Sequence, residues 1–329
     1  PITSIAGINI VGNQWQEEFS GAITDSIGNP IPASDLANFD ERFDVAVKNT
    51  HDNPDEYTSP PGAIIEYDRV TGLQNKEQSL ILNYTNLQPY HSAQAYRTLF
   101  SDQDYTLYNA LRLYIHGSDN FDIEKSPEFY IRFGSGKYDY YEYRTSVSPG
   151  WSEENHLRII FNDLTILKSE TEIARQTTID TTSTIILSDG REHSVRFKSG
   201  PPGEGLNLAI VDLEGNKQIR VLGSPALARI RHITVGIYNP YDEILVGGEL
   251  WLNELRAADV RRDRGLAGRL KVNADIADVF SIFGTIRSVD SHFRRIGGDE
   301  AGTTSTVTNL STLLNLGKML PKNWGLSIP

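Results

Sequence analysis

The chain of 329 residues contains no cysteine, which excludes disulfide bonds, thiolate zinc sites and cysteine nucleophiles. It also has no run of 18 apolar residues, so it does not encode a transmembrane helix. A membrane β-barrel is not excluded, because barrel strands alternate apolar and polar residues and escape a hydropathy search. The 27 glycines and 15 prolines suit a β-rich protein with many turns rather than a disordered chain.

Motifs of common enzymes are missing as well. The patterns HExxH, GxSxG and SxxK do not occur. Residues 134–137 (GSGK) resemble the end of a phosphate-binding loop, but two positions that this motif requires do not fit. Glu153 and Glu154 with Asp163 resemble the paired acids of a glycosidase, yet such pairings arise by chance in a chain with 43 acidic residues. We therefore predict that the protein is not an enzyme.

Only weak signals for a binding site remain. Asp119, Asp122 and Glu124 follow a predicted strand and could supply oxygen ligands to Ca²⁺, although loop carboxylates are more often simply solvated. Four tyrosines within residues 138–144 could form a platform that stacks on sugars, or they could pack one face of a buried strand. Apart from this possible calcium ion, we predict no cofactor.

The net charge of −12 is unevenly distributed along the chain. Residues 250–329 carry a net charge of +3, so residues 1–249 carry −15. A body this acidic repels phosphate backbones, and we expect no nucleic-acid partner.

Apolar and polar residues alternate in the middle of the chain, with the period of two that half-buried strands require. Leu111, Leu113 and Ile115 show this alternation clearly. Further strands are predicted at residues 129–133, 138–144, 156–161, 184–187, 193–198, 206–212, 230–238 and 249–256. Short strands separated by turn residues predict an antiparallel, jelly-roll-like β-sandwich over residues 101–260. Its core is expected to include Leu111, Leu113, Ile115, Ile131, Phe133, Ile159, Phe161, Val235 and Ile237.

The regions beside these strands are less regular. Residues 1–100 are predicted to be an irregular or β segment that leads into the sandwich, with a strand at residues 80–84. A short helix is expected within residues 91–108. Residues 151–167 are predicted to form a strand and then a turn rather than a helix, because Asn162 and Asp163 follow an apolar run.

The last 65 residues have a different pattern. Residues 266–276 alternate almost perfectly over eleven positions, which is the length that a membrane β-strand requires. Residues 279–288 and 304–316 continue the pattern, and Trp324 stands where an interfacial aromatic residue would lie. We predict about three transmembrane β-barrel strands over residues 266–329. From periodicity alone, a soluble hairpin extension is an equal alternative.

Two motifs resemble a known family. A Trp-x-Asn-Glu-Leu-Arg run begins at residue 251, and a Pro-Lys-x-Trp-Gly run begins at residue 321, with β-alternation between them. This combination resembles the giant outer-membrane translocon family of the type IX secretion system, the SprA or Sov family. The residues that carry the resemblance are Trp251, Asn253, Glu254, Leu255, Arg256, Pro321, Lys322, Trp324 and Gly325. The resemblance is looser over residues 100–230 and weak over residues 1–100.

The resemblance implies a single-chain β-barrel in the cell outer membrane that exports folded cargo proteins and serves gliding motility. It implies as partners a shuttle barrel protein of the PorV type, a periplasmic plug protein, cargo proteins with a C-terminal secretion signal, and outer-membrane lipid. The sandwich would then be a cap or gate. Residues 1–230 alone leave an alternative open, a secreted jelly-roll carbohydrate-binding module with a β-hairpin tail.

Loop lengths predict which side of the membrane the sandwich occupies. Outer-membrane barrels have short periplasmic turns and longer extracellular loops. Residues 277–278 and 321–323 are short turns and residues 289–303 form a long loop, which places the sandwich on the extracellular side. The arginines at 261, 262 and 264 could pair with lipid head groups or lipopolysaccharide phosphates, or form a solvated turn. Because the sequence starts at Pro1 and stops within an apparent strand, we expect a piece of a longer protein.

Overall fold

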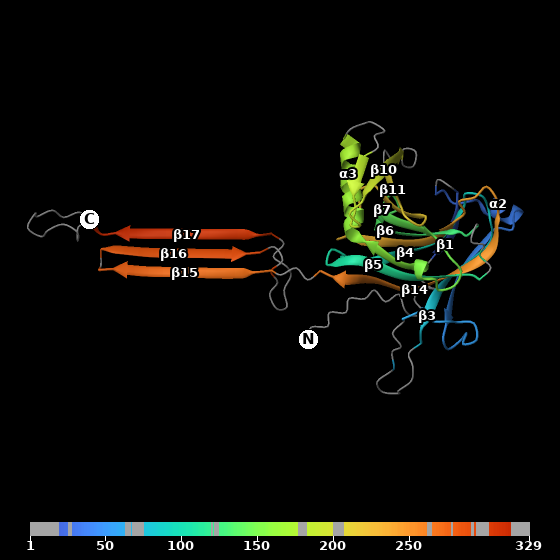
Figure 1. Ribbon diagram of the computed structural model, residues 1–329, viewed down its shortest axis with the longest axis horizontal. Coiled ribbons are helices and arrows are strands. Elements are labelled where there is room, and N and C mark those ends of the chain that lie inside the picture. The colour runs from blue at the N-terminus through green and yellow to red at the C-terminus, as the bar shows by residue number, and fades with distance from the viewer. Residues whose placement is uncertain are drawn as a thin grey trace, which may run out of the picture. The chain divides into compact units, whose positions relative to one another are not determined.

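The computed structural model describes residues 20–25, 28–62, 67, 76–119, 121, 125–176, 183–199, 207–261, 265–277, 279–290, 293 and 303–316. The chain divides into two compact units, residues 1–260 and residues 261–329. Figure 1 shows that strands dominate both. Neither α-helix in the described part of the chain is long and apolar enough to cross a membrane.

The first unit is an antiparallel β-sandwich, as predicted. Its larger sheet has nine strands and its smaller sheet has five, and all neighbouring strands are antiparallel. In spatial order, the larger sheet consists of β1 (Ser20–Thr24), β4 (Ser92–Gln103), β13 (Ile230–Tyr238), β6 (Glu128–Gly136), β7 (Asp139–Ser146), β12 (Lys217–Leu222), β11 (Asn207–Leu213), β10 (Glu192–Ser199) and β9 (Ser183–Ile186). The smaller sheet consists of β2 (Arg42–Asn49), β3 (Gln78–Leu87), β14 (Leu245–Val260), β5 (Tyr108–Gly117) and β8 (His156–Ile160).

The core lies between the two sheets. In Figure 1, β5 and β14 of the smaller sheet run below β4, β6 and β7 of the larger one. All nine residues that the sequence predicted for the core are at most 3% exposed. Each fully buried Leu, Ile, Val or Phe side chain stabilises the fold by about 1.5–3 kcal/mol relative to an exposed one. The period of two therefore identified the correct inward face on these strands.

Three helical segments accompany the sheets: α2 (Ala33–Asn38), the 3₁₀ turn η1 (Glu153–Asn155) and α3 (Phe161–Gln176). The helix α3 packs against β5, β11 and β12 (Figure 1). It places Phe161, Leu164 and Leu167 in the core at the helical spacing of three.

Two predictions of local structure were wrong. The helix expected within residues 91–108 is the strand β4, whose backbone pairs with β1 on one side and β13 on the other. The turn expected after the strand at residues 156–161 is instead the beginning of α3. Asp163 lies in the first turn of this helix and accepts hydrogen bonds from the backbone N–H and the hydroxyl of Ser188. In both places, tertiary contacts outweigh a weak local pattern.

The sandwich also draws on residues before position 101. Four strands, β1 to β4, come from residues 20–103, although residues 1–100 were predicted only to lead into the sandwich. β3 includes the predicted strand at residues 80–84, whereas β1, β2 and β12 matched no predicted strand.

The second unit is a three-stranded antiparallel sheet made of β15 (Ala267–Ile276), β16 (Phe280–Val289) and β17 (Ser305–Leu314). Each strand has ten residues, and the register runs without a bulge. Three residues connect β15 to β16 and fifteen connect β16 to β17. Ala277 in the short connection has a φ of +47°, as a tight turn requires.

The two faces of this sheet differ in polarity. The register places nine apolar residues on one face, here called the apolar face: Leu270, Val272, Ala274, Ile276, Phe280, Ile282, Ile286, Leu310 and Leu314. Four hydroxyl residues share this face, Ser288, Thr306, Thr308 and Thr312. The opposite, polar face carries Arg269, Lys271, Asn273, Asp275, Ser281, Thr285, Arg287, Asn309 and Ser311, together with four apolar residues, Phe283, Val289, Val307 and Leu313. Leu270 is 59% exposed and Leu310 is 72% exposed, so the apolar face is open.

Candidate functional site

The outer face of the larger sheet carries an unusual set of buried polar side chains. The alternation that sends Ile131 and Tyr143 into the core sends their neighbours Tyr130, Arg132 and Glu142 to the opposite face. Tyr130 is 0% exposed and Glu142 only 1% exposed, although both lie outside the main core. Buried charges on a sheet face need partners, and these are supplied by adjacent strands.

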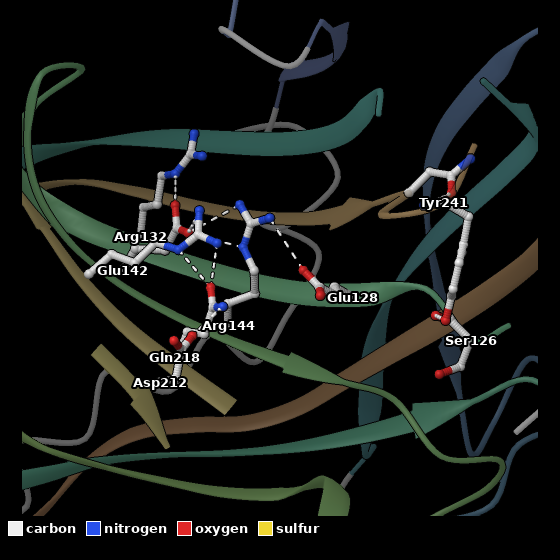
Figure 2. Close-up of polar contacts among 10 residues, drawn as sticks. Ser126, Glu128, Arg132, Glu142, Arg144, Asp212, Gln218 and Tyr241 are labelled. Atoms are coloured by element: carbon white, nitrogen blue, oxygen red, sulfur yellow. Dashed lines mark hydrogen bonds and ion pairs between the residues drawn. The ribbon is translucent and has the colours of Figure 1, made fainter. Parts of the chain in front are cut away.

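Glu142 on β7 lies at the centre of what we call the carboxylate network (Figure 2). Its Oε2 accepts a hydrogen bond from Nε of Arg132 at 2.5 Å, and its Oε1 accepts one from Nε of Arg144 at 3.1 Å. Nη1 of Arg220 lies 3.5 Å from the same Oε1. Arg144 also forms an ion pair of 3.3 Å with Glu128. Three guanidinium groups thus surround one carboxylate.

Tyrosine rings separate these guanidinium groups. Arg132 lies 4.5 Å from the ring centre of Tyr130 and 4.9 Å from that of Tyr140. Arg144 lies 5.2 Å from Tyr130 and 4.6 Å from Tyr238. Such contacts are favourable because the ring face is negative, and more so when water is excluded. The result is an alternating stack of tyrosine and arginine across three strands.

A glycine makes room for this stack. A Cβ atom on Gly236 of β13 would lie 2.4 Å from Cζ of Tyr130, so only glycine lets the Tyr130 ring lie across β13. From there the Tyr130 hydroxyl donates a hydrogen bond of 2.9 Å to Gln94 on β4.

The electrostatics of the network keep Glu142 ionised. Burial alone would raise the pKa of its carboxyl, but Arg132, Arg144 and Arg220 together hold that pKa well below its ordinary value of 4.5. A carboxylate that is sealed and paired in this way is a poor general acid or base. The network therefore fixes β6, β7 and β12 to one another rather than offering a reactive group.

The outer face of the smaller sheet carries a second feature, which we call the tryptophan cluster. Trp251 on β14 is 5% exposed and stacks on His116 at 4.4 Å and on Tyr57 at 5.8 Å between ring centres. Trp151 meets both Trp251 and His116 edge-on, and its Nε1 donates a hydrogen bond of 2.9 Å to the carbonyl oxygen of Thr58. The cluster thereby holds the segment between β2 and β3 against the sheet.

A bulge explains the pattern of the Trp-x-Asn-Glu-Leu-Arg motif. Leu252 and Leu255 both point into the core, although they are three residues apart and a regular strand alternates every two. The register with β5 shifts between Asn253 and Arg256, and Glu254 adopts a φ of +54°.

Asn253 stabilises this bulge. Its Oδ1 accepts a hydrogen bond from the backbone N–H of Glu254 at 2.7 Å. Its Nδ2 donates to the Tyr57 hydroxyl at 3.0 Å and to Glu77 at 2.9 Å. In the described part of the chain, the motif is therefore a structural element that joins β14 to the segment before β3.

The residues that the sequence singled out for metal binding are only partly described. Asp119 is exposed in a turn, whereas Asp122 and Glu124 lie outside the described residues. Within the described residues, no group of three His, Asp or Glu side chains is placed to hold a metal ion.

The four tyrosines of residues 138–144 do not share one surface. Tyr141 and Tyr143 belong to the core, Tyr140 belongs to the stack, and Tyr138 lies in the turn between β6 and β7. The GSGK segment forms the end of β6 and the same hairpin turn. The other signature residues, Pro321, Lys322, Trp324 and Gly325, lie outside the described residues.

Comparisons with known proteins give one family and a distant structural likeness. The family SprA_N, described as motility related/secretion protein, matches residues 3–329. No curated protein matches the chain. Among solved structures, a family 11 carbohydrate-binding module of the cellulosomal cellulase Lic26A-Cel5E of Clostridium thermocellum is 11% identical, with a TM-score of 0.33 over 75% of this chain and 91% of that one. The family 11 module from Clostridium thermocellum in complex with a β-1,3-1,4-mixed-linked tetrasaccharide is 13% identical, with a TM-score of 0.30 over 73% and 96%. At these scores the likeness carries no argument about binding.

Proposed function

Because the chain belongs to the SprA_N family of motility related/secretion proteins, we propose that it is a segment of the outer-membrane protein-export channel of the type IX secretion system. The second unit contributes strands to the channel wall, and the first unit caps or gates the opening. The channel conducts folded cargo proteins that carry a C-terminal secretion signal to the cell surface.

The two-faced sheet of the second unit is the observation that carries this proposal. Its strands have ten residues each, within the 9–11 that a tilted membrane strand requires. Exposed apolar patches of this kind are costly in water, whereas lipid would cover the apolar face and leave the polar face toward a water-filled lumen. Within the described residues, β15 and β17 each pair with one neighbour only, and further strands of a closed wall would satisfy their free edges.

The proposal includes partners and excludes catalysis. A shuttle barrel protein of the PorV type, a periplasmic plug protein and outer-membrane lipid would act with this segment, as the family resemblance implies. The burial of Glu142 and its contacts with Arg132 and Arg144 agree with a rigid structural role for this face of the first unit. We propose no cofactor.

Substitutions on the two faces of β17 test the membrane assignment. Leu310→Arg places a charge on the apolar face and is expected to destabilise insertion by about 2–4 kcal/mol near the bilayer midplane. The measured quantity is the amount of folded, protease-resistant protein in the outer-membrane fraction. The matched control is Asn309→Arg, one residue away on the polar face, which is expected to insert normally. Equal behaviour of the two variants would rule out a lipid-facing role for the apolar face.

The connection lengths favour an extracellular cap. The three-residue connection after β15 suits the periplasmic side and the fifteen-residue connection after β16 suits the outside. The sandwich precedes β15 and would then lie outside. Ser101 is exposed, and the chain has no native cysteine. A Ser101→Cys variant in intact cells is therefore expected to react with a membrane-impermeant maleimide. Labelling only after the outer membrane has been breached would place the sandwich in the periplasm.

A further inference from the structure

Three arginines form a row across the outer face of the smaller sheet. Arg256 on β14 lies directly opposite Arg112 on β5, and Arg112 lies directly opposite Arg158 on β8. Like charges at directly opposed positions of neighbouring strands destabilise a sheet. We call these residues the arginine row. A sheet that keeps such a row needs anions to compensate it.

Among the described residues, two carboxylates compensate the row. Asp259, which has a φ of +57°, pairs with Arg112 at 3.2 Å and with Arg158 at 2.8 Å. Glu254 pairs with Arg256 at 3.2 Å. In the part of the chain that the structure describes, two carboxylates thus pair with three guanidinium groups.

Two arginines of the row also present their guanidinium groups to solvent. The side chain of Arg158 is 53% exposed and that of Arg256 is 37% exposed, so solvent reaches two of the three.

The row makes its neighbourhood electropositive. Burial, Arg112 and Arg256 lower the pKa of His156, and the opposing effect of Glu153 is smaller. Arg261 follows β14 directly. This contrasts with the net charge of −15 over residues 1–249.

We propose that the arginine row binds phosphate groups of lipopolysaccharide and so holds the first unit against the outer leaflet. Guanidinium groups match phosphate oxygens with paired hydrogen bonds. Tyr114, two residues from Arg112 on the same face of β5, stacks on His156. Trp151 meets His116, the next residue of that face, edge-on. Tyr and Trp favour membrane interfaces.

This inference rests on the proposed function, in which β15 enters the membrane from outside. Six residues separate β14 from β15, so seven Cα–Cα steps join the two strands and span at most about 25 Å. If β15 starts at the outer surface, the end of β14 therefore lies within that reach of the lipid head groups. Lipopolysaccharide phosphates are the anions that an outer leaflet presents there.

The test measures binding of the full chain to vesicles of phosphatidylcholine with and without lipopolysaccharide. Each arginine near a charged surface contributes about fivefold to the binding constant. The double variant Arg158→Gln/Arg256→Gln is therefore expected to lose about 25-fold of the affinity that depends on lipopolysaccharide. The matched control is the double variant Arg191→Gln/Arg196→Gln, since both arginines are similarly exposed and each forms an ion pair with an acidic residue. It is expected to bind like the native chain.

Two results would overturn the inference. One is equal binding of the double variant and the control to lipopolysaccharide vesicles. The other is equally tight binding of the native chain to phosphatidylglycerol vesicles, which would reject lipopolysaccharide as the ligand. Salt-resistant insertion into vesicles of phosphatidylcholine alone reports on the proposed function separately, because it depends on the apolar face and not on the arginine row.

Discussion

Replacing Glu142 with glutamine is expected to lower the free energy of unfolding by about 3–5 kcal/mol, because it leaves buried guanidinium groups without their central carboxylate. Chemical denaturation at neutral pH measures this loss. The matched control is Glu128→Gln, since Glu128 is 26% exposed and makes one ion pair of 3.3 Å. That control is expected to cost about 1 kcal/mol or less.

The loss of unfolding free energy caused by Glu142→Gln should become smaller at acidic pH. The folded-state pKa of Glu142 lies below its ordinary value of 4.5, so its contribution to stability is complete above that value and is lost as the pH falls below it. The difference between the native chain and Glu142→Gln should therefore be constant near neutrality and shrink below about pH 4.5. A difference that grows on acidification would contradict the ionised, paired carboxylate.

Replacing Trp251 with alanine is expected to cost about 3–5 kcal/mol, because it removes a buried ring that stacks on Tyr57 and His116. The loss should also release the segment that carries Tyr57. Limited proteolysis of the native chain and the variant measures this, with faster cleavage expected between β2 and β3.

Trp251→Phe is the control that separates packing from hydrogen bonding. The indole Nε1 has no hydrogen-bond partner among the described residues. Phenylalanine therefore keeps most of the ring stacking and removes no hydrogen bond to a described residue. We expect it to cost less than half as much as alanine. Equal destabilisation by phenylalanine and alanine would contradict the assignment of the Trp251 contribution to ring stacking.

The sequence was informative on strands such as β5 and β6, where one face is purely apolar. Ile131 and Phe133 alternate with polar residues, and they occupy the predicted core positions. It was misleading where the inward residues were small. Ala93 and Ala95 of β4 are fully buried, but alanine suits a helix as well as a strand, and only pairing with β1 and β13 decides between them.

The carboxylate network could not be found from the sequence. Arg132, Glu142 and Arg144 alternate with core residues, and charged residues in such positions normally face solvent. Arg220 comes from β12, which no sequence pattern predicted. The one usable signal was charge complementarity, because Arg132 and Glu142 are directly opposed on β6 and β7, but it required the register to be known.

The family resemblance drawn from Trp251 to Arg256 is confirmed by the match over residues 3–329. Its physical basis was not visible in the sequence. A run of Trp, Asn and Glu in a strand gives no sign that Glu254 adopts a left-handed backbone, or that Asn253 bonds to Tyr57 almost two hundred residues earlier. Such a contact is set by the tertiary fold and not by local propensity.

Cysteine scanning along β15 tests most directly whether the second unit is part of a membrane channel wall. The chain has no native cysteine, so each introduced thiol is unique. The substituted positions are Arg269, Lys271 and Asn273 on the polar face and Leu270, Val272 and Ala274 on the apolar face. In native outer membranes, a hydrophilic maleimide is expected to label the polar-face positions and to reach the apolar-face positions only after detergent is added. Equal labelling of both sets before detergent would show that the apolar face does not lie in the membrane.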